Sequence, residues 1–389
     1  MLLRALLAAA LVAVANPAQA ADGFGPLELK VGQDSLRFAF MGQLRFTFDD
    51  KDGADERTQT DKFTLQRVRP VLEGKFLDKK LQFKLHLNAG PTTIELLDMF
   101  VGYTFGPRLM LRVGQQKTPF TRHRQGSFAR LTLVDWSPAV RYFGAERQIG
   151  AMLHDGYKSE DGLEYAVGVF TGVNARSGFE RGPSKVYGVS LPNPSDLANP
   201  AAPAHLHPEL VARVGYHLGK DTFASDSDLE GGPLRLTTGL SVAWDVRPEV
   251  ARDFAVRLAP EVTVKAWGWS ATAVGYAGFF EATQGGKVQL GALGMFAQTA
   301  YRFLERYEVA LRYSRVDVLD RMRTDAAAWA ATQTGVTAST TEAQQEFAAG
   351  VNIYFVDHQL KWQNDIALLT TAPGDRQDVE YRSQLQVMF

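Results

Sequence analysis

Long runs of alternating apolar and polar residues fill most of the sequence from about residue 36 to its end. Phe38, Phe40, Leu44, Phe46 and Phe48 share one parity and alternate with a set that includes Gln, Arg and Thr. Period-two alternation gives a strand one apolar and one polar face. Runs of about 10–15 residues suit a tilted strand that crosses ~30 Å of hydrocarbon, whereas strands in soluble sandwiches are usually about 5–6 residues long. The pattern predicts an all-β fold, a transmembrane antiparallel β-barrel.

The runs number about sixteen, and an even number is typical of bacterial outer-membrane barrels. Between residues 267 and 303 the alternation is poor, so it does not fix the register there. The predicted strands are 36–48, 62–76, 80–90, 93–105, 108–116, 147–157, 163–172, 208–218, 233–246, 253–267, 269–283, 287–303, 307–319, 345–356, 358–371 and 377–389.

The connections between these runs alternate in length. Several odd-to-even connections are long, at 49–61, 117–146, 173–207 and 320–344, whereas most even-to-odd connections are short. Short periplasmic turns and longer external loops distinguish outer-membrane barrels. The segment 219–232 breaks this rule, because it falls on the short side yet has 14 residues. A miscounted strand would explain it.

Both ends of the sequence fit export to the outer membrane. Residues 1–20 have a short charged start, an apolar run and Ala18-Gln19-Ala20, the pattern of a cleaved secretory signal peptide. The last run alternates up to a terminal aromatic residue, Phe389, and resembles the C-terminal signature of bacterial outer-membrane proteins. The predicted organisation is a signal peptide (1–20), an N-terminal periplasmic segment (21–35) and one barrel (36–389).

Composition excludes several classes of function. The chain has no Cys, which excludes disulfides, Cys-ligated metals and thiol catalysis. The formal net charge is −1, which gives no basic excess for nucleic acid. No catalytic motif is present, and His205 and His207 are best interpreted as surface loop residues rather than metal ligands. We therefore predict no catalytic residue, metal or cofactor.

The polar faces of the predicted strands are richer in bases than in acids. Thirteen bases and six acids fall on the inward parity, although the whole chain is nearly neutral. Rings of Arg and Lys favour anions, whereas the alternative is a generally polar lumen whose charges pair across strands. The acids are Glu73, Asp98, Asp245, Glu261, Glu308 and Asp365. The bases are Arg45, Arg67, Arg69, Lys75, Lys84, Arg112, Arg213, Arg235, Arg257, Lys265, Arg312, Lys361 and Arg382.

The connection 117–147, the third external one, is dense in cations and aromatic rings. It contains Phe120, Phe128, Trp136, Tyr142 and Phe143, which are poorly suited to lie in water. Folding into the lumen would bury these rings and narrow the pore, and packing at the rim or against another protomer is the alternative. Its candidate constriction residues are Lys117, Arg122, Arg124, Arg130, Arg141 and Arg147.

Residues 95–150 resemble the phosphate-selective porin O/P family of bacterial outer-membrane porins. The resemblance rests on Glu95–Tyr103, on the VGQQKTPF segment at 113–120, and on RQIG at 147–150. It implies a sixteen-stranded homotrimer in outer-membrane lipid, with a third loop folded into the pore and basic residues that pass small anionic solutes. It also implies that Lys117, Arg122, Arg124 and Arg130 lie at the constriction.

The sequence therefore predicts an outer-membrane porin that prefers anions. Phosphate is one candidate solute. Three alternatives remain at this point. A structural or adhesive barrel with a plugged lumen would not conduct. An outer-membrane enzyme would need a His paired with Ser or Asp at the barrel wall, and a general porin would lack the anion preference.

Overall fold

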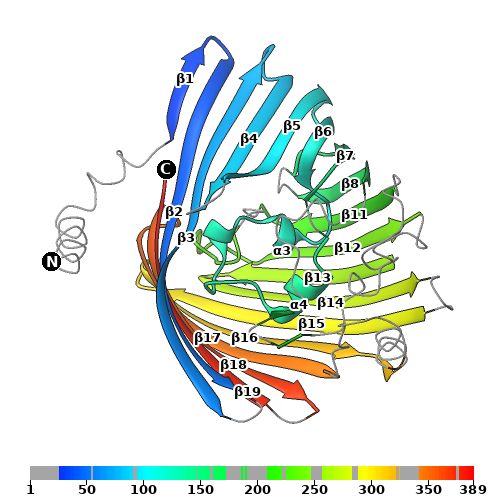
Figure 1. Cartoon of the computed structure of the whole chain (residues 1–389). Coiled ribbons are helices and arrows are strands. Elements are labelled where there is room, and N and C mark those ends of the chain that lie inside the picture. Colours follow the sequence, from blue (N-terminus) through cyan, green and yellow to red (C-terminus); the bar gives the residue numbers. More distant parts are fainter. Residues whose placement is uncertain are drawn as a thin grey trace.

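In the computed structural model, sixteen antiparallel strands of the described part of the chain pair side by side and close into a barrel (Figure 1). The ring closes where the last strand pairs with the first, β19 with β2, and continues across the gap in numbering where β8 pairs with β11. The strands agree with all sixteen predicted runs to within about five residues at either end. The prediction of an all-β transmembrane barrel is confirmed.

The barrel strands have the following bounds: β2 Asp34–Asp52, β3 Arg57–Phe76, β4 Leu81–Ala89, β5 Ile94–Gly106, β6 Leu109–Lys117, β7 Arg147–His154, β8 Gly162–Phe170, β11 Glu209–Leu218, β12 Arg235–Asp245, β13 Val256–Ala266, β14 Trp269–Ala282, β15 Val288–Phe303, β16 Tyr307–Val318, β17 Ala343–Val356, β18 Leu360–Ala372 and β19 Arg376–Met388. Two short strands, β9 (Lys185–Val186) and β10 (Val189–Ser190), form a separate hairpin.

The structure describes residues 26–53, 56–90, 94–145, 147–157, 161–171, 185–186, 189–190, 208–220, 225–246, 256–282, 288–320, 324, 341–373 and 376–389. The predicted signal peptide, His205 and His207, and most of the loops 173–207 and 320–344 lie outside these ranges. Within them, no helix is long and apolar enough to cross a membrane.

One strand was not predicted. β1 (Leu27–Val31) pairs with the start of β2, so that part of the segment 21–35 is a β-hairpin. β1 continues the line of β19, because Leu27 pairs with Phe38 while the chain's last residue, Phe389, pairs with Phe40. Figure 1 shows this hairpin projecting beside the seam between β2 and β19.

Strand burial follows the predicted parity. In β11, for example, Val211, Arg213 and His217 are buried in the lumen, whereas Val214 and Tyr216 are exposed on the outer wall. Apolar residues on the lipid face and polar residues inside are the arrangement that a bilayer requires of a barrel. The sequence alternation therefore reports which side chains reach the lumen.

The poorly alternating strands β14 and β15 have a local cause. Their lumen-facing residues Val274, Tyr276 and Phe296 are apolar because they pack against aromatic residues of the connection between β6 and β7. Both faces of these strands are thus apolar or small, and the polar–apolar contrast is lost.

Two connections fold into the barrel. The third loop, which we define as residues 118–145, carries three short helices: α3 (Arg122–Gln125), η1 (Phe128–Arg130) and α4 (Pro138–Phe143). Figure 1 shows α3 and α4 inside the ring of strands, as predicted for this loop. The second segment, the lumen insert (residues 225–232), belongs to the 219–232 connection. A miscounted strand is therefore not its explanation.

Candidate functional site: the lumen and its two cavities

Hydroxyl side chains begin each short helix of the third loop. Thr121 accepts a hydrogen bond from the Arg124 amide, Ser127 from the Ala129 amide, and Ser137 from the Val140 amide. Such caps satisfy amides that the first turn leaves unpaired. Pro138 adds a preset backbone angle at the start of α4. The loop's turns are therefore encoded locally, in its own sequence.

Polar side chains of the wall hold the backbone of the third loop inside the lumen. The Leu131 carbonyl accepts from Lys361 Nζ at 2.9 Å and from Gln363 Nε2 at 3.0 Å. Asn352 Nδ2 donates to the Thr132 carbonyl at 2.7 Å. A loop that crosses a barrel has no ladder of its own, so these wall residues supply partners that its buried backbone would otherwise lack.

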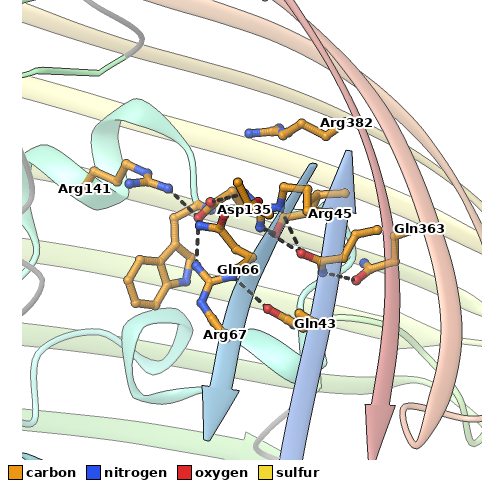
Figure 2. Close-up of polar contacts among 12 residues, drawn as sticks. Gln43, Arg45, Gln66, Arg67, Asp135, Arg141, Gln363 and Arg382 are labelled. Carbon is orange, nitrogen blue, oxygen red and sulfur yellow. Dashed lines mark hydrogen bonds and ion pairs between the residues drawn. The ribbon is translucent and has the colours of Figure 1, made fainter. Parts of the chain in front are cut away.

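Asp135 is the charged centre of this attachment. Its carboxylate lies 3.1 Å from Arg45, 3.7 Å from Arg67 and 2.5 Å from Arg141, all measured from guanidinium nitrogens (Figure 2). Burial alone would raise the pKa of this carboxyl, but Arg141, Arg67 and Arg45 hold that pKa well below its ordinary value. One carboxylate thus ties two wall strands, β2 and β3, to helix α4.

Aromatic rings of the third loop are buried as predicted. Phe120, Trp136 and Phe143 are at most 2% exposed. Phe143 stacks on Tyr276 of β14 at 5.3 Å between ring centroids. Within the loop, the guanidinium of Arg124 lies 3.5 Å from the centroid of the Trp136 ring. Cations over ring faces add to the burial that fixes the loop.

The predicted constriction residues lie in and around the third loop, but most make protein contacts. The Lys117 ammonium donates to the carbonyls of Arg124 at 3.0 Å and Gly126 at 2.5 Å, at the end of α3. Arg122 donates to Thr237 at 2.6 Å, and its amide donates to the Glu261 carboxylate at 2.9 Å.

The remaining members differ in their surroundings. Arg141 contacts Asp135, as described, and Arg147 Nε lies 2.7 Å from Asp98 Oδ1. Arg130 is different, because its side chain makes no ion pair with any residue in the described ranges. Burial lowers the pKa of its guanidinium, and nearby Arg37 lowers it further.

The structure shows a smaller excess of bases over acids in the lumen than the sequence predicted. Three acids that the count omitted also face the lumen, and each pairs with a predicted lumen arginine: Glu164 with Arg213 at 2.8 Å, Glu346 with Arg312 at 2.7 Å, and Glu209 with Arg257. Arg382 is likewise paired, in two-point contact with Asp365. Most of the arginines on the half of the wall from β11 to β19 are thereby neutralised.

The lumen insert lies against the third loop inside the barrel. His123 Nδ1 of α3 lies 3.1 Å from Asp226 of the insert, and the Asp226 amide donates to the Arg130 carbonyl at 3.1 Å. Ser227 donates to Glu308 of β16 at 3.1 Å. The insert is therefore joined both to the third loop and to the wall. The sequence signal for it was the length of 219–232.

A cavity of about 310 Å³ lies between the third loop and strands β3–β7; we call it the loop cavity. Of the predicted lumen bases, Arg69, Lys75, Lys84 and Arg112 line it, whereas Arg45 and Arg67 contact the third loop. The ionisable residues of its lining are Arg69, Glu73, Lys75, Lys84, His86, Asp98, Arg112, Lys117 and Arg147.

Two cations of the loop cavity have no carboxylate partner. Arg112 and Lys75 make no ion pair within the described part of the chain. Arg112 instead lies 4.9 Å from the centroid of the Phe100 ring. The two acids are engaged, Glu73 by Lys84 at 3.1 Å and Asp98 by Arg147. The water-accessible charge of this cavity is therefore positive.

A second cavity, of about 460 Å³, lies between the lumen insert and the seam of β2 and β19; we call it the seam cavity. It includes Asp357 and His358 of the short turn between β17 and β18, which places it at the short-turn end of the barrel. Among the described residues, no group of three or more His, Asp or Glu side chains is arranged to hold a metal ion.

Comparisons with known proteins agree with this architecture. The model of a family described as phosphate-selective porin O and P matches residues 38–367. No curated protein sequence matches the chain.

Solved structures match almost the whole chain at low sequence identity. The outer membrane channel DcaP of Acinetobacter baumannii has a TM-score of 0.58 at 12% identity, with 93% of this chain and 99% of that chain covered. An anion-selective porin from Comamonas acidovorans has a TM-score of 0.56 at 12% identity, with 92% and 100% covered. A trimer form of OmpT, an outer membrane protein of Vibrio cholerae, has a TM-score of 0.52 at 10% identity, with 92% and 99% covered.

Proposed function

Because the chain belongs to the phosphate-selective porin O and P family and is an outer-membrane porin, we propose that it passes small anions, phosphate among them, through the loop cavity. Family and fold are those of a channel, and we propose no catalytic activity. The observation that carries the proposal is the pair of cations, Arg112 and Lys75, that face the loop cavity without carboxylate partners.

The physical basis is electrostatic. A narrow, low-dielectric lumen concentrates the field of its unpaired charges, which raises the local concentration of counter-ions. Guanidinium and ammonium groups also replace part of the hydration that an anion loses on entry. Wall arginines paired with carboxylates contribute little net potential, so selectivity comes from the β3–β7 side.

The predicted constriction cations have a structural part in this proposal. Lys117, Arg122, Arg124 and Arg141 hold the third loop in place, and Arg147 pairs with Asp98 at the wall of the loop cavity. Neutralising Lys117, Arg122 and Arg124 together would disturb the loop itself. Arg112 and Lys75 are therefore the residues on which a selectivity test depends.

The wider assembly also belongs to the proposal. We propose a homotrimer in outer-membrane lipid, exported with a signal peptide at residues 1–20 that is cleaved after Ala20. The trimer form of the structurally similar OmpT supports the oligomer, and the A-x-A pattern supports the cleavage site.

The test is the reversal potential across a salt gradient, with the purified protein in a planar bilayer. We expect a clear anion preference that falls in the double variant Arg112→Gln with Lys75→Gln. The matched control is Lys79→Gln with Lys80→Gln, which removes two charges from an exposed turn that lines neither cavity.

Three outcomes would count against the proposal. Cation selectivity of the wild type would exclude an anion channel. An unchanged reversal potential in the double variant would exclude Arg112 and Lys75 as its cause. Absence of conductance would favour a plugged structural barrel, because the third loop and the lumen insert already fill part of the lumen.

A further inference from the structure

The seam cavity has one cationic wall. The cations Arg130 and Lys265 line it, and Arg37, which lies 3.4 Å from Glu73, lines it on the β2 side. Its three acids are paired with arginines: Asp228 lies 2.5 Å and Glu230 2.7 Å from guanidinium nitrogens of Arg235, which also lines the cavity, and Asp357 lies 3.2 Å from Arg302. Arg130 therefore presents an uncompensated charge to the cavity.

His358 adds a polar group that is neutral rather than charged. Its Nε2 lies 2.9 Å from Ser225 Oγ, while its buried Nδ1 has no hydrogen-bond partner in the described part of the chain. Burial holds the pKa of His358 well below its ordinary value, and Lys361, Arg130, Lys265 and Arg302 reinforce this. A surrounding of four cations disfavours a further positive charge and favours an anion.

The other wall of the seam cavity is apolar. Ala39 of β2, Met388 of β19 and Leu229 of the lumen insert contribute to it. Ala39 and Met388 have the parity that faces the lumen, so they are not part of the lipid-facing surface. The volume of about 460 Å³ falls in the range of small-molecule sites and exceeds what an inorganic oxyanion needs.

From these two walls we infer that the seam cavity binds an organic anion with a short apolar body, its carboxylate or similar head on Arg130 and its body against Met388 and Leu229. This inference rests on the proposed function, because solutes reach the cavity through the lumen. It departs from that function in the ligand, since the apolar wall selects against a bare oxyanion.

The position of the seam cavity predicts from which side of the membrane its ligand enters. Asp357 and His358 belong to a short turn, and short turns of an outer-membrane barrel face the periplasm. An organic anion added on that side enters the barrel at the end where the seam cavity lies.

The test compares hexanoate with acetate as blockers of ion current at neutral pH, added on the short-turn side of the reconstituted full-length protein. Each buried methylene strengthens binding about fourfold, so we expect the half-blocking concentration of hexanoate to be about tenfold or more below that of acetate. Inorganic phosphate, which has no apolar body, should block no better than acetate on this side.

Two variants locate the effect. Met388→Ser with Leu229→Ser should reduce the preference for hexanoate over acetate, a readout that a purely structural role would not change. Arg130→Gln should weaken block by both carboxylates about tenfold, and Arg130→Lys, which keeps the charge, should restore part of it. A heat-induced gel shift establishes that each variant is a folded barrel, and Lys80→Gln is the control for loss of charge.

Equal block by hexanoate and acetate would overturn the inference, as would wild-type block by hexanoate in Arg130→Gln. The outcomes for the proposed function are separate. If the wild type shows no anion preference while calorimetry still detects hexanoate binding that depends on Arg130, the proposed function fails and the site stands. If the wild type prefers anions but Arg130→Gln does not change block by hexanoate, the proposed function stands and the seam-cavity site is excluded.

Discussion

At the scale of single residues, Asp135 is the side chain on which the shape of the pore most depends. It is buried among three arginines, and removing one partner of a buried ion pair leaves uncompensated charge. We expect Asp135→Asn to lower the free energy of unfolding by about 3–5 kcal/mol. Urea unfolding in lipid vesicles, followed by tryptophan fluorescence, measures this. Asp357→Asn is the control, because Asp357 is 64% exposed and such a pair contributes about 0–1 kcal/mol.

The pKa of Asp135 also fixes the sign of the pH dependence. Because its folded pKa lies well below the unfolded value of about 3.9, the stabilisation is present above that unfolded value and is lost as pH falls through the folded pKa. The difference in stability between wild type and Asp135→Asn should thus stay constant from pH 8 to pH 5. A difference that vanished within that window would contradict the assignment.

At the scale of elements, the lumen insert decides how much of the barrel remains open. Replacing residues 225–230 by a short Gly-Ser linker removes its contacts with His123 and Glu308, and we expect single-channel conductance to rise. The control is Asp78→Asn with Lys79→Gly in the turn after β3, where both positions have positive φ and tolerate these residues. Unchanged conductance in the linker variant would show that the insert lies outside the conduction path.

The same elements show how far the sequence predicts this fold. Strand positions were predictable because lipid outside and water inside impose alternation, and the rings of the third loop predicted its burial. The register of β14 and β15 could not be predicted. Their lumen positions hold Tyr276 and Phe296, which pack against that loop, instead of the polar residues that usually mark the lumen face. The pairing of Glu164, Glu209 and Glu346 with lumen arginines also needed three-dimensional register, since the partners lie on different strands.

For the whole molecule, stability depends on closing the ring between its first and last strands. Phe389 exchanges both backbone hydrogen bonds with Phe40, at 2.9 and 3.0 Å. Its ring stacks on Phe40 at 5.4 Å between centroids and approaches Phe38 at 6.5 Å. A barrel lacks free edges only when this seam is closed, so contacts at the seam stabilise every other strand.

Phe389→Ala keeps the backbone pairing and removes both ring contacts. Aromatic pairs contribute about 0.5–1.5 kcal/mol each, so we expect the loss of two pairs to lower the unfolding free energy by about 1–3 kcal/mol and the folded fraction in vesicles to fall with it. Phe105→Ala is the control, because it removes an exposed ring and its contact with Tyr103 at the same end of the barrel but away from the seam. If the two variants lost the same stability, the loss would reflect lipid contact of an aromatic ring and not closure between β2 and β19.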